Sequence, residues 1–339
     1  MATIVDVATR AGVSVSTVSY ALSGSRPISE ETKQRIQQAI AELGYQPNKL
    51  ARSLVSRRSE SIAVVSSRLE FPGPARTLVG IEQQAVEFGY SVILSLLHEP
   101  AEANVMPILD ALVARQADGI IWAASEIGDN RGWVGPERLN NLPPIVFLGK
   151  PRPGLTTISA DSYAGACIAI QHLIDQGRRT IALVTGSLNH RAASLRFAGW
   201  EETLQKNQLV PDSSLVAEAD WTAAGGNQAA RALLAQRPAV DAIFAASDLM
   251  ALGVLSAARN LGRRVPDDLA VVGFDNVPES EFYSPPLTTM YTRRDQVGRL
   301  AVQELHRLIE AKHRGAPLEP SARTITPELV IRASSVVQR

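Results

Sequence analysis

Apolar residues recur at helical spacing in three short runs within the first 44 residues. The first run ends at Gly12, which favours the left-handed conformation of a helix end, and Ser14 can cap the run that follows. The third run follows Ser29 and ends at Gly44. The apolar positions are Ile4, Val7, Ala8 and Ala11, then Val15, Val18 and Leu22, and last Ile36, Ala39, Ile40 and Leu43. This pattern predicts three short helices around a small core, with a tight turn between the first two.

From Ser61 onward, short apolar runs alternate with longer helical ones. A second series begins near Asp161 and resembles the first in length. The predicted strands are Ser61–Ser66, Ser91–Leu97, Gly119–Ala123, Ile145–Leu148, Thr180–Thr185, Ala242–Ala246 and Leu269–Phe274. The predicted helices are Pro74–Phe88, Glu102–Gln116, Ser162–Gln176, Ala192–Lys206, Thr222–Ala235 and Asp248–Leu261. This alternation predicts an α/β core of two subdomains, each a doubly wound parallel sheet flanked by helices.

Length and charge agree with a small N-terminal domain followed by this core. The chain has 339 residues, of which 45% are hydrophobic and 20% charged, so ordinary globular cores are expected. The net charge is zero, but residues 1–60 carry eight basic and five acidic side chains, an excess of +3. A basic N-terminal domain suits contact with phosphate groups, although a solvated charged surface has the same count.

The single cysteine, Cys167, lies in an apolar helical run and is expected to be a buried small residue rather than a nucleophile. One cysteine forms no intramolecular disulfide, which fits a reducing compartment. The N-terminus lacks the pattern of a signal peptide, and no apolar stretch is long enough for a membrane span. We therefore expect a cytoplasmic protein without a membrane partner.

The first two predicted helices form a helix-turn-helix, whose second helix fits the major groove of DNA. Many all-α proteins contain the same geometry, so the pattern alone leaves DNA binding at about even odds. The residue string is more specific, because Asp-Val-Ala, Ala-Gly-Val-Ser and Ser-Thr-Val-Ser follow one another within residues 6–19. This string resembles the N-terminal headpiece of the lactose-repressor (LacI/GalR) family. Residues 45–54, Tyr-Gln-Pro-Asn-Lys-Leu-Ala-Arg-Ser-Leu, resemble the hinge of that family.

The resemblance covers essentially the whole chain and implies its domain organisation. It implies a helix-turn-helix headpiece at residues 1–46, a hinge and linker at 47–60, and a periplasmic-binding-protein-like effector-binding core at 61–339. In this family the chain crosses three times between the halves of the core. The first half would comprise residues 61–160 and 292–322, including the helix Asp295–Lys312. The second half would comprise residues 161–291 and 323–339, with the last strands near Thr324–Ile331.

The resemblance also implies a function, that of a bacterial, nucleoid-associated homodimeric transcriptional repressor controlled by a small molecule. Its DNA partner would be double-stranded, near-palindromic operator DNA, and induction and co-repression both remain open. Nothing after Ile331 resembles a heptad repeat, so a dimer is expected rather than a tetramer. The predicted DNA-binding residues are Thr3, Ser14, Val15, Ser16, Thr17, Ser19 and Tyr20 in the headpiece, and Asn48, Ala51, Arg52 and Leu54 in the hinge.

Candidate effector contacts follow the predicted strands, since open parallel sheets bind ligands beyond the carboxyl ends of their strands. Asp275 follows a buried strand and matches a family aspartate that accepts hydrogen bonds from ligand hydroxyls; a turn cap is the alternative. Arg196 matches an effector-contacting arginine, and Trp221 a ring that stacks on sugars or anchors a core. Asp248 opens a helix and is as well explained as a cap. The predicted effector residues are Phe71, Trp122, His190, Arg196, Trp221, Asp248 and Asp275. The resemblance implies a mono- or oligosaccharide effector, and no cofactor or metal is expected.

Some positions depart from the family pattern. Gly73 and Pro74 stand where relatives often carry an aromatic pair, and Phe71 can replace that pair from a different angle. Ser247 and Gly149 replace an asparagine and a carboxylate found in some members. In the predicted recognition helix, Tyr20 stands where many relatives carry arginine or histidine.

Two other classes of protein remain as alternatives. A solute-binding protein that feeds a transporter shares the core fold, but it is exported and carries no DNA-binding headpiece. A sugar-metabolising enzyme is disfavoured, because the chain lacks a Gly-x-Gly-x-x-Gly turn, a phosphate-binding loop, a Gly-x-Ser-x-Gly elbow and a metal-spaced His/Cys cluster.

The hinge generates the first testable prediction. In the family, a leucine matching Leu54 wedges into the minor groove and kinks the operator; packing of Leu54 on the core is the alternative. Leu54→Ser is expected to weaken operator binding and to reduce the DNA bend while the affinity for effector stays unchanged. The mobility of circularly permuted operator fragments measures the bend, and a bend as strong as that of the parent protein contradicts the assignment.

Overall fold

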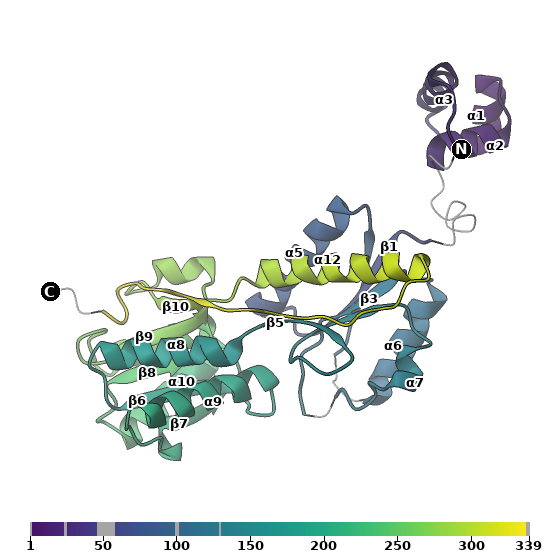
Figure 1. Ribbon diagram of the computed structural model, residues 1–339. Coiled ribbons are helices and arrows are strands. Elements are labelled where there is room, and N and C mark those ends of the chain that lie inside the picture. The colour runs from purple at the N-terminus through teal and green to yellow at the C-terminus, as the bar shows by residue number, and fades with distance from the viewer. Residues whose placement is uncertain (1, 24–25, 46–57, 99–101, 129, 337–339) are drawn as a thin grey trace. The chain divides into compact units, whose positions relative to one another are not determined.

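A computed structural model describes residues 2–23, 26–45, 58–98, 102–128 and 130–336. The chain divides into two compact units, Met1–Glu60 and Ser61–Arg339, which we call the N-terminal unit and the core (Figure 1). In the described parts of both units, none of the helices combines the length and apolar character that a membrane span requires.

The N-terminal unit contains the three predicted helices, α1 (Ile4–Ala11), α2 (Val15–Ser23) and α3 (Glu30–Leu43). Helix α1 ends at Gly12, whose φ of 64° is the left-handed conformation that glycine adopts without a steric penalty. Val7, Val18 and Ile36 are fully buried and form the centre of the small core. Val15 was expected on the apolar stripe of α2, but it is 40% exposed and lies outside this core.

The core contains two six-stranded sheets in the described residues. Their strands are β1 (Ser61–Ser66), β2 (Ser91–Leu96), β3 (Gly119–Trp122), β4 (Ile145–Leu148), β5 (Thr156–Ala160), β6 (Ile181–Gly186), β7 (Val216–Ala219), β8 (Ala242–Ala245), β9 (Ala270–Asp275), β10 (Thr288–Tyr291), β11 (Ala322–Ile325) and β12 (Glu328–Val330). The first sheet has the order β11-β5-β4-β3-β1-β2 and the second the order β12-β10-β9-β8-β6-β7. All pairings are parallel except that of β10 with β12.

The helices of the core are α5 (Pro72–Glu87), α6 (Glu102–Ala114), α7 (Pro136–Leu139), α8 (Ser162–Asp175), α9 (Arg191–Lys206), α10 (Ala223–Gln236), α11 (Asp248–Asn260) and α12 (Arg294–His313). Two short 3₁₀ helices, Ser213–Leu215 and Pro278–Phe282, complete the described elements. Every helix predicted from the apolar pattern is present, with ends that shift by three residues at most. Strands β5, β7 and β10 were not predicted, because their sequences, Thr-Thr-Ile-Ser-Ala, Val-Ala-Glu-Ala and Thr-Thr-Met-Tyr, lack the continuous apolar run of the predicted strands.

Along the described residues, the chain passes between the two sheets three times, after β5, β10 and β11. The predicted division placed all residues after 322 in the second half, and this part of it is wrong. Strand β11 pairs in parallel with β5, with Thr324 opposite Ser159, so it is the edge strand of the first sheet. The last crossing therefore falls between Ile325 and Glu328.

Helices cover both faces of the first sheet. Helices α5 and α12 pack together against one face through Ile81, Val297 and Ala301, and α6 packs on the other face through Leu109 and Leu112. The two helices of the first face approach closely at Gly80 and Gly298. A Cβ atom on Gly80 would lie 2.0 Å from the carbonyl oxygen of Asp295, and one on Gly298 would lie 2.2 Å from that of Thr77. This contact holds the middle of α5 against the first turns of α12.

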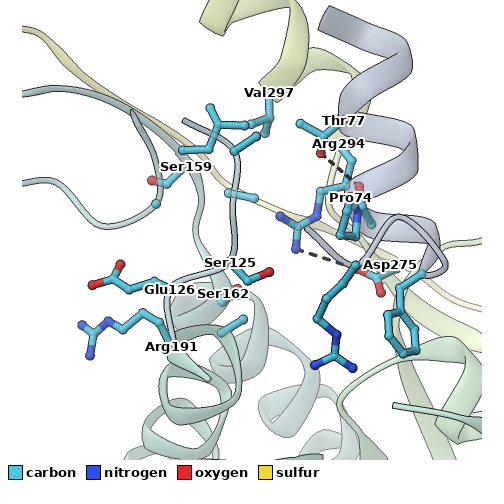
Figure 2. A pocket seen from close by; sticks show the side chains of 18 of the residues that line it. Pro74, Thr77, Ser125, Glu126, Ser159, Ser162, Arg191, Asp275, Arg294 and Val297 are labelled. Atoms are coloured by element: carbon cyan, nitrogen blue, oxygen red, sulfur yellow. Dashed lines mark hydrogen bonds and ion pairs between the residues drawn. The ribbon is translucent and has the colours of Figure 1, made fainter. Parts of the chain in front are cut away.

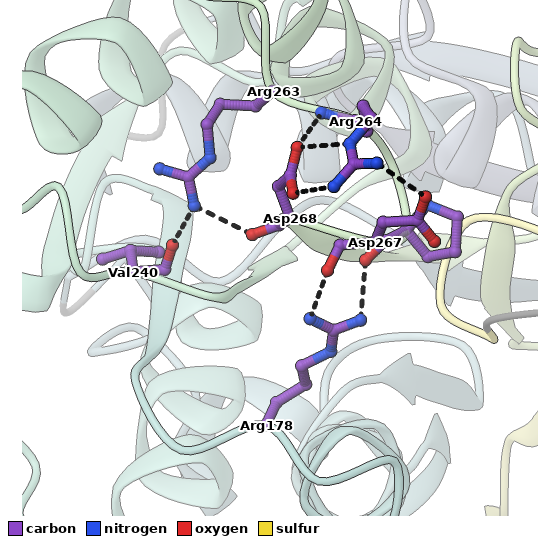
Figure 3. Close-up of polar contacts among 7 residues, drawn as sticks. Arg178, Val240, Arg263, Arg264, Asp267 and Asp268 are labelled. Carbon is purple, nitrogen blue, oxygen red and sulfur yellow. Dashed lines mark hydrogen bonds and ion pairs between the residues drawn. The ribbon is translucent and has the colours of Figure 1, made fainter.

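A polar cluster organises the amino-terminal edge of the second sheet (Figure 3). The guanidinium of Arg178 donates to the carbonyl oxygens of Pro266 and Asp267, at 2.6 and 3.2 Å. Arg263 donates to the carbonyl oxygens of Val240 and Asp268, at 2.7 and 2.8 Å. These bonds join the loop between α11 and β9 to the segments that precede β6 and β8. They lie at the amino-terminal ends of the strands and leave out the residues at the carboxyl ends of β6, β8 and β9.

Candidate functional site

A cavity of about 460 Å³ lies at the carboxyl ends of the strands of both sheets (Figure 2). The first sheet contributes Ser66 at the end of β1 and the segment Ala123–Glu126 after β3. The second sheet contributes Trp221 after β7 and Asp275 at the end of β9. The cavity therefore occupies the place where the strand-end rule predicts a ligand.

Asp275 projects into this cavity from a strained position. It is the last residue of β9, and its φ of 114° lies in a region that side-chain-bearing residues rarely adopt. Its nearest cation is Arg294, whose Nη2 lies 4.0 Å from Oδ1. That Oδ1 atom is buried and accepts no hydrogen bond from the described residues. A buried carboxylate oxygen without a donor is an acceptor site for a bound molecule.

Arg196 approaches the cavity from α9. Only 2% of its surface is exposed, and its Nη1 donates to the carbonyl oxygen of Ala246. The guanidinium lies over the ring of Phe274, 3.7 Å from the centroid. Burial lowers the pKa of Arg196 to about 10, while the nearby carboxylate of Asp275 opposes this shift. The side chain therefore stays charged at neutral pH, and its Nε is buried without an acceptor in the described part of the chain.

An aromatic wall stands beside these charges. Trp221 packs over Gly186, where an added Cβ would lie 2.0 Å from the indole ring. His190 meets Trp221 edge-on, with the centroids 5.9 Å apart, and its Nε2 lies 3.0 Å from Nη1 of Arg68. Because a guanidinium only donates, Nε2 accepts, so His190 is neutral with its proton on Nδ1. Burial and then the charge of Arg68 lower the pKa of His190, in agreement with a neutral ring. Phe71 completes the wall, with Arg68 4.5 Å from its ring centroid.

Asp248 has a different role from the two that the sequence suggested. Ser247 is the helix cap, because its hydroxyl accepts the N–H of Met250 at 3.2 Å. Asp248 is fully buried at the cavity wall, and both of its carboxylate oxygens are occupied. They accept the N–H of Val277 at 2.7 Å and the hydroxyl of Thr289 at 2.5 Å. Asp248 therefore holds the 275–277 loop rather than a ligand.

Trp122 was predicted to line the cavity, and this prediction is wrong. It is 1% exposed and packs against Trp133, with the ring centroids 4.8 Å apart. Because neighbouring strand residues point to opposite faces, Trp122 joins the core beneath α6, while Ile121 faces α5 and α12.

The cavity lining includes further charged residues that were not predicted, among them Arg68, Glu126, Lys150, Asp161 and Arg294. Arg191 and Arg294 are the first residues of α9 and α12, and the Nε of each is buried without a described acceptor. The carboxyl ends of the predicted strands did not point to Arg294, because β10, which it follows by three residues, was not among them.

The N-terminal unit presents a mostly uncharged face on α2. Ser14, Val15 and Ser16 are exposed, and Thr17, Ser19 and Tyr20 are half-buried. The Ser14 hydroxyl accepts the N–H of Thr17 at 3.1 Å, as a cap should, and Thr3 caps α1 in a capping box with Asp6. The guanidinium of Arg26 lies 4.9 Å from the ring centroid of Tyr20. The predicted hinge contacts Asn48, Ala51, Arg52 and Leu54 lie outside the described residues.

A helix-turn-helix unit joined to a two-sheet core with a strand-end cavity defines a class: regulators that read DNA with one unit and bind a small molecule with the other. Residues 3–48 match the model of bacterial regulatory proteins of the lacI family, and residues 170–335 match that of a periplasmic binding protein-like domain. The chain is 34% identical over 338 residues to the HTH-type transcriptional repressor PurR of Glaesserella parasuis serovar 5 (strain SH0165), and the match covers 98% of each.

Solved structures agree with these matches. The lac repressor dimer bound to operator and the anti-inducer ONPF has a TM-score of 0.89 and 30% identity, with 99% of each chain covered. The complex of the transcriptional regulator CelR with cellobiose has a TM-score of 0.73 and 31% identity, with 98% of this chain and 100% of that one covered. The chain belongs to the lacI family of bacterial regulatory proteins. It is a DNA-binding transcriptional repressor with a ligand-binding core, not an enzyme.

The buried carboxylate of Asp248 generates a prediction about stability. Burial, reinforced by the charge of Asp275, raises the pKa of Asp248 to about 7 from its ordinary value of 3.8. Between about pH 4 and 7 the native state therefore holds a proton that the unfolded state has lost, so stability falls as pH rises. Asp248→Asn should lack this fall, because its amide is neutral, keeps an oxygen for Val277 and donates to the Thr289 hydroxyl oxygen.

Urea unfolding between pH 4.5 and 7.5 measures the effect. The free energy of unfolding of the parent, relative to that of Asp248→Asn, should fall by on the order of 1–4 kcal/mol over this range. Asp110→Asn, an exposed change on α6, is the matched control. Parallel pH profiles for the parent and Asp248→Asn would show that Asp248 does not hold the extra proton.

Proposed function

We propose that this protein acts in the bacterial cytoplasm as a homodimeric repressor of a near-palindromic operator, and that a sugar bound in the core cavity controls its affinity for DNA. The dimeric form is supported by the lac repressor dimer on its operator, which this chain resembles over 99% of its length. Two helix-turn-helix units related by a two-fold axis read two inverted half-sites.

The polar groups at the Asp275 end of the cavity suit a ligand with several hydroxyls. Asp275 offers an acceptor without a donor, and Arg196 and Arg294 each offer a buried donor without an acceptor. A hydroxyl both donates and accepts, so neighbouring hydroxyls of one sugar can satisfy the carboxylate and the guanidinium groups together. The indole of Trp221 adds an apolar surface that suits the C–H face of a sugar ring.

A planar heterocycle, such as a purine base, is the competing ligand class, and the cavity suits it less well. Such a ring is best held by stacking against aromatic faces. Gly73 and Pro74 offer no aromatic ring at the start of α5, and one face of Phe71 is covered by the guanidinium of Arg68. The similar CelR structure holds cellobiose, which supports a saccharide as the ligand class here.

Contacts between the two halves of the core suggest how the ligand acts. Arg76 of α5 donates to the carbonyl oxygen of Asn276 at 3.1 Å, and the N–H of Arg191 donates to the carbonyl oxygen of Glu126 at 3.0 Å. The second contact joins two residues of the cavity lining, and the first lies next to Asp275 in the sequence. A ligand that binds both halves therefore favours one degree of closure over another. The closure that the ligand favours then sets the affinity of the paired N-terminal units for DNA.

A thermal-shift screen of the full chain tests the ligand class, because a ligand that binds the native state raises the melting temperature. Mono- and oligosaccharides form one arm of the screen, and purine bases form the other. A rise in melting temperature only in the purine arm would overturn the sugar assignment.

Asp275→Ala provides a sharper test of the cavity. The variant should bind operator DNA like the parent, because residue 275 lies in the core and not in the N-terminal unit. Ligand hydroxyls would lose their acceptor, at a cost of about 1–3 kcal/mol, or roughly 5- to 150-fold in affinity. Fluorescence anisotropy with an operator selected from randomised DNA measures both properties. A response at the parent's effector concentration would remove Asp275 from the site.

The exposed face of α2 generates a prediction about DNA sequence. Its residues are uncharged, so bases should be discriminated by hydroxyl and apolar contacts. Tyr20→Arg should change the preferred base at one symmetric pair of operator positions, because arginine favours guanine in the major groove. Selection on randomised DNA with the parent and the variant measures the preference. The same preference for both proteins would remove Tyr20 from the base-reading set.

A further inference from the structure

The cavity has a second polar end, formed by Glu126 and Arg191. In Figure 2 these two side chains lie together, apart from Asp275 and Arg294. A second hollow of about 550 Å³ begins at this end and shares Glu126, Lys150 and Arg191 with the main cavity. A ligand held at Asp275 therefore has room to extend toward this end.

Positive charge exceeds negative charge in the second hollow. Its lining includes Lys150, Arg152 and Arg191 but only one carboxylate, that of Glu126, among the residues that the structure describes. The Oε1 of Glu126 lies 2.8 Å from Nη2 of Arg152. Its Oε2 lies 3.8 Å from Nη1 of Arg131 and accepts no hydrogen bond from the described residues. Arg131 is 2% exposed and adds a further cation behind the wall. The local charge is therefore positive even after Glu126 is counted.

A buried hydrogen-bond donor without an acceptor lies at the same positively charged end of the cavity. The Nε of Arg191 is buried and has no hydrogen-bond acceptor among the described residues. Arg191 is also the first residue of α9, a helix of 16 residues whose N-cap, His190, makes no side-chain capping bond. The amino-terminal end of a helix carries a partial positive charge that favours anions. Lys150 is exposed at the rim and can turn its ammonium group toward the same place.

We propose that the effector carries an anionic group, a phosphate or a carboxylate, which Arg191 and Lys150 bind at this end while the hydroxyls of the sugar occupy the Asp275 end. This inference rests on the proposed sugar-controlled repressor and specifies the chemical class of its ligand. A sugar hydroxyl or an anion can supply the missing acceptor for Arg191, but only an anion also balances the local positive charge. A guanidinium binds either oxyanion through parallel hydrogen bonds.

The test compares matched pairs of ligands on the full chain. Each neutral sugar is measured beside its anionic derivatives: glucose with glucose 6-phosphate and glucuronate, fructose with fructose 1-phosphate, and trehalose with trehalose 6-phosphate. Thermal shift identifies the binders, and calorimetry measures their dissociation constants. At least one anionic derivative should bind roughly tenfold or more tightly than its parent sugar, with an affinity that falls as salt rises. The phosphate and glucuronate arms show which anion is used.

Variants assign the effect to the site. Arg191→Gln should weaken binding of the anionic ligand roughly tenfold and that of the neutral parent by less than threefold. Lys150→Gln should weaken it in the same selective way, and this exposed position is not needed for folding. Arg179→Gln, an exposed change before β6, is the control and should alter neither.

Each outcome has a defined meaning. Equal affinity for the anionic and neutral members of every pair overturns the anion site but leaves a neutral sugar as the effector. Equal weakening of both members by Arg191→Gln and Lys150→Gln also overturns it. No binding by any saccharide, neutral or anionic, overturns the proposed sugar effector and this inference with it.

Discussion

The carboxylate of Asp248, buried at the carboxyl edge of the second sheet, accepts hydrogen bonds from Val277 and Thr289. These bonds hold a loop in which Asp275 and Asn276 both have positive φ, a conformation that the loop would not keep by itself. The side chain of Asp275 then faces the cavity. The adjacent Asn276 accepts a hydrogen bond from Arg76 at its carbonyl oxygen and another from Arg332 at its side-chain oxygen. Ligand recognition and contact between the halves thus depend on the same buried group.

Several contacts between the halves near the cavity are single hydrogen bonds. Besides Arg76 with Asn276, they include Arg68 with His190 at 3.0 Å and the N–H of Gly128 with the carbonyl oxygen of Asn189 at 3.0 Å. Each such bond contributes only about 0.5–1.5 kcal/mol net, because water can replace either partner when the halves separate. A ligand that binds one closure better by a few kcal/mol is therefore sufficient to shift the balance between closures.

The sequence predicted the fold well because its strongest signals are local. Apolar periodicity located the long helices, and the residues at Gly12, Ser14 and Ser29 marked helix ends where they occur. Edge strand β11 was placed in the wrong sheet, because its residues Ala322–Ile325 carry little apolar pattern and its partner β5 lies about 160 residues earlier. Pairing over such a separation leaves no local signal.

The sequence predicted residues of the candidate site correctly only where the direction of a predicted strand determines the position of the residue. Asp275 follows a buried strand, so the strand-end rule found it. Trp122 was wrongly assigned to the cavity, because a one-residue difference along a strand reverses the direction of the side chain. Asp248 was wrongly assigned to the ligand or to a helix cap, because its buried carboxylate accepts a hydrogen bond from the neighbouring 275–277 loop. Arg191 and Glu126 come from opposite halves, and only the tertiary structure shows that their backbones meet.

The three crossings between the sheets also set an order of events during synthesis of the chain. Strand β11 completes the first sheet and β12 the second, and both lie within residues 322–330. Neither sheet can be finished until that segment has left the ribosome. The N-terminal unit has its own buried core and needs none of those residues, so it can fold while most of the core is still being made. The nascent chain can therefore have a folded DNA-binding unit before the cavity that binds the controlling ligand is complete.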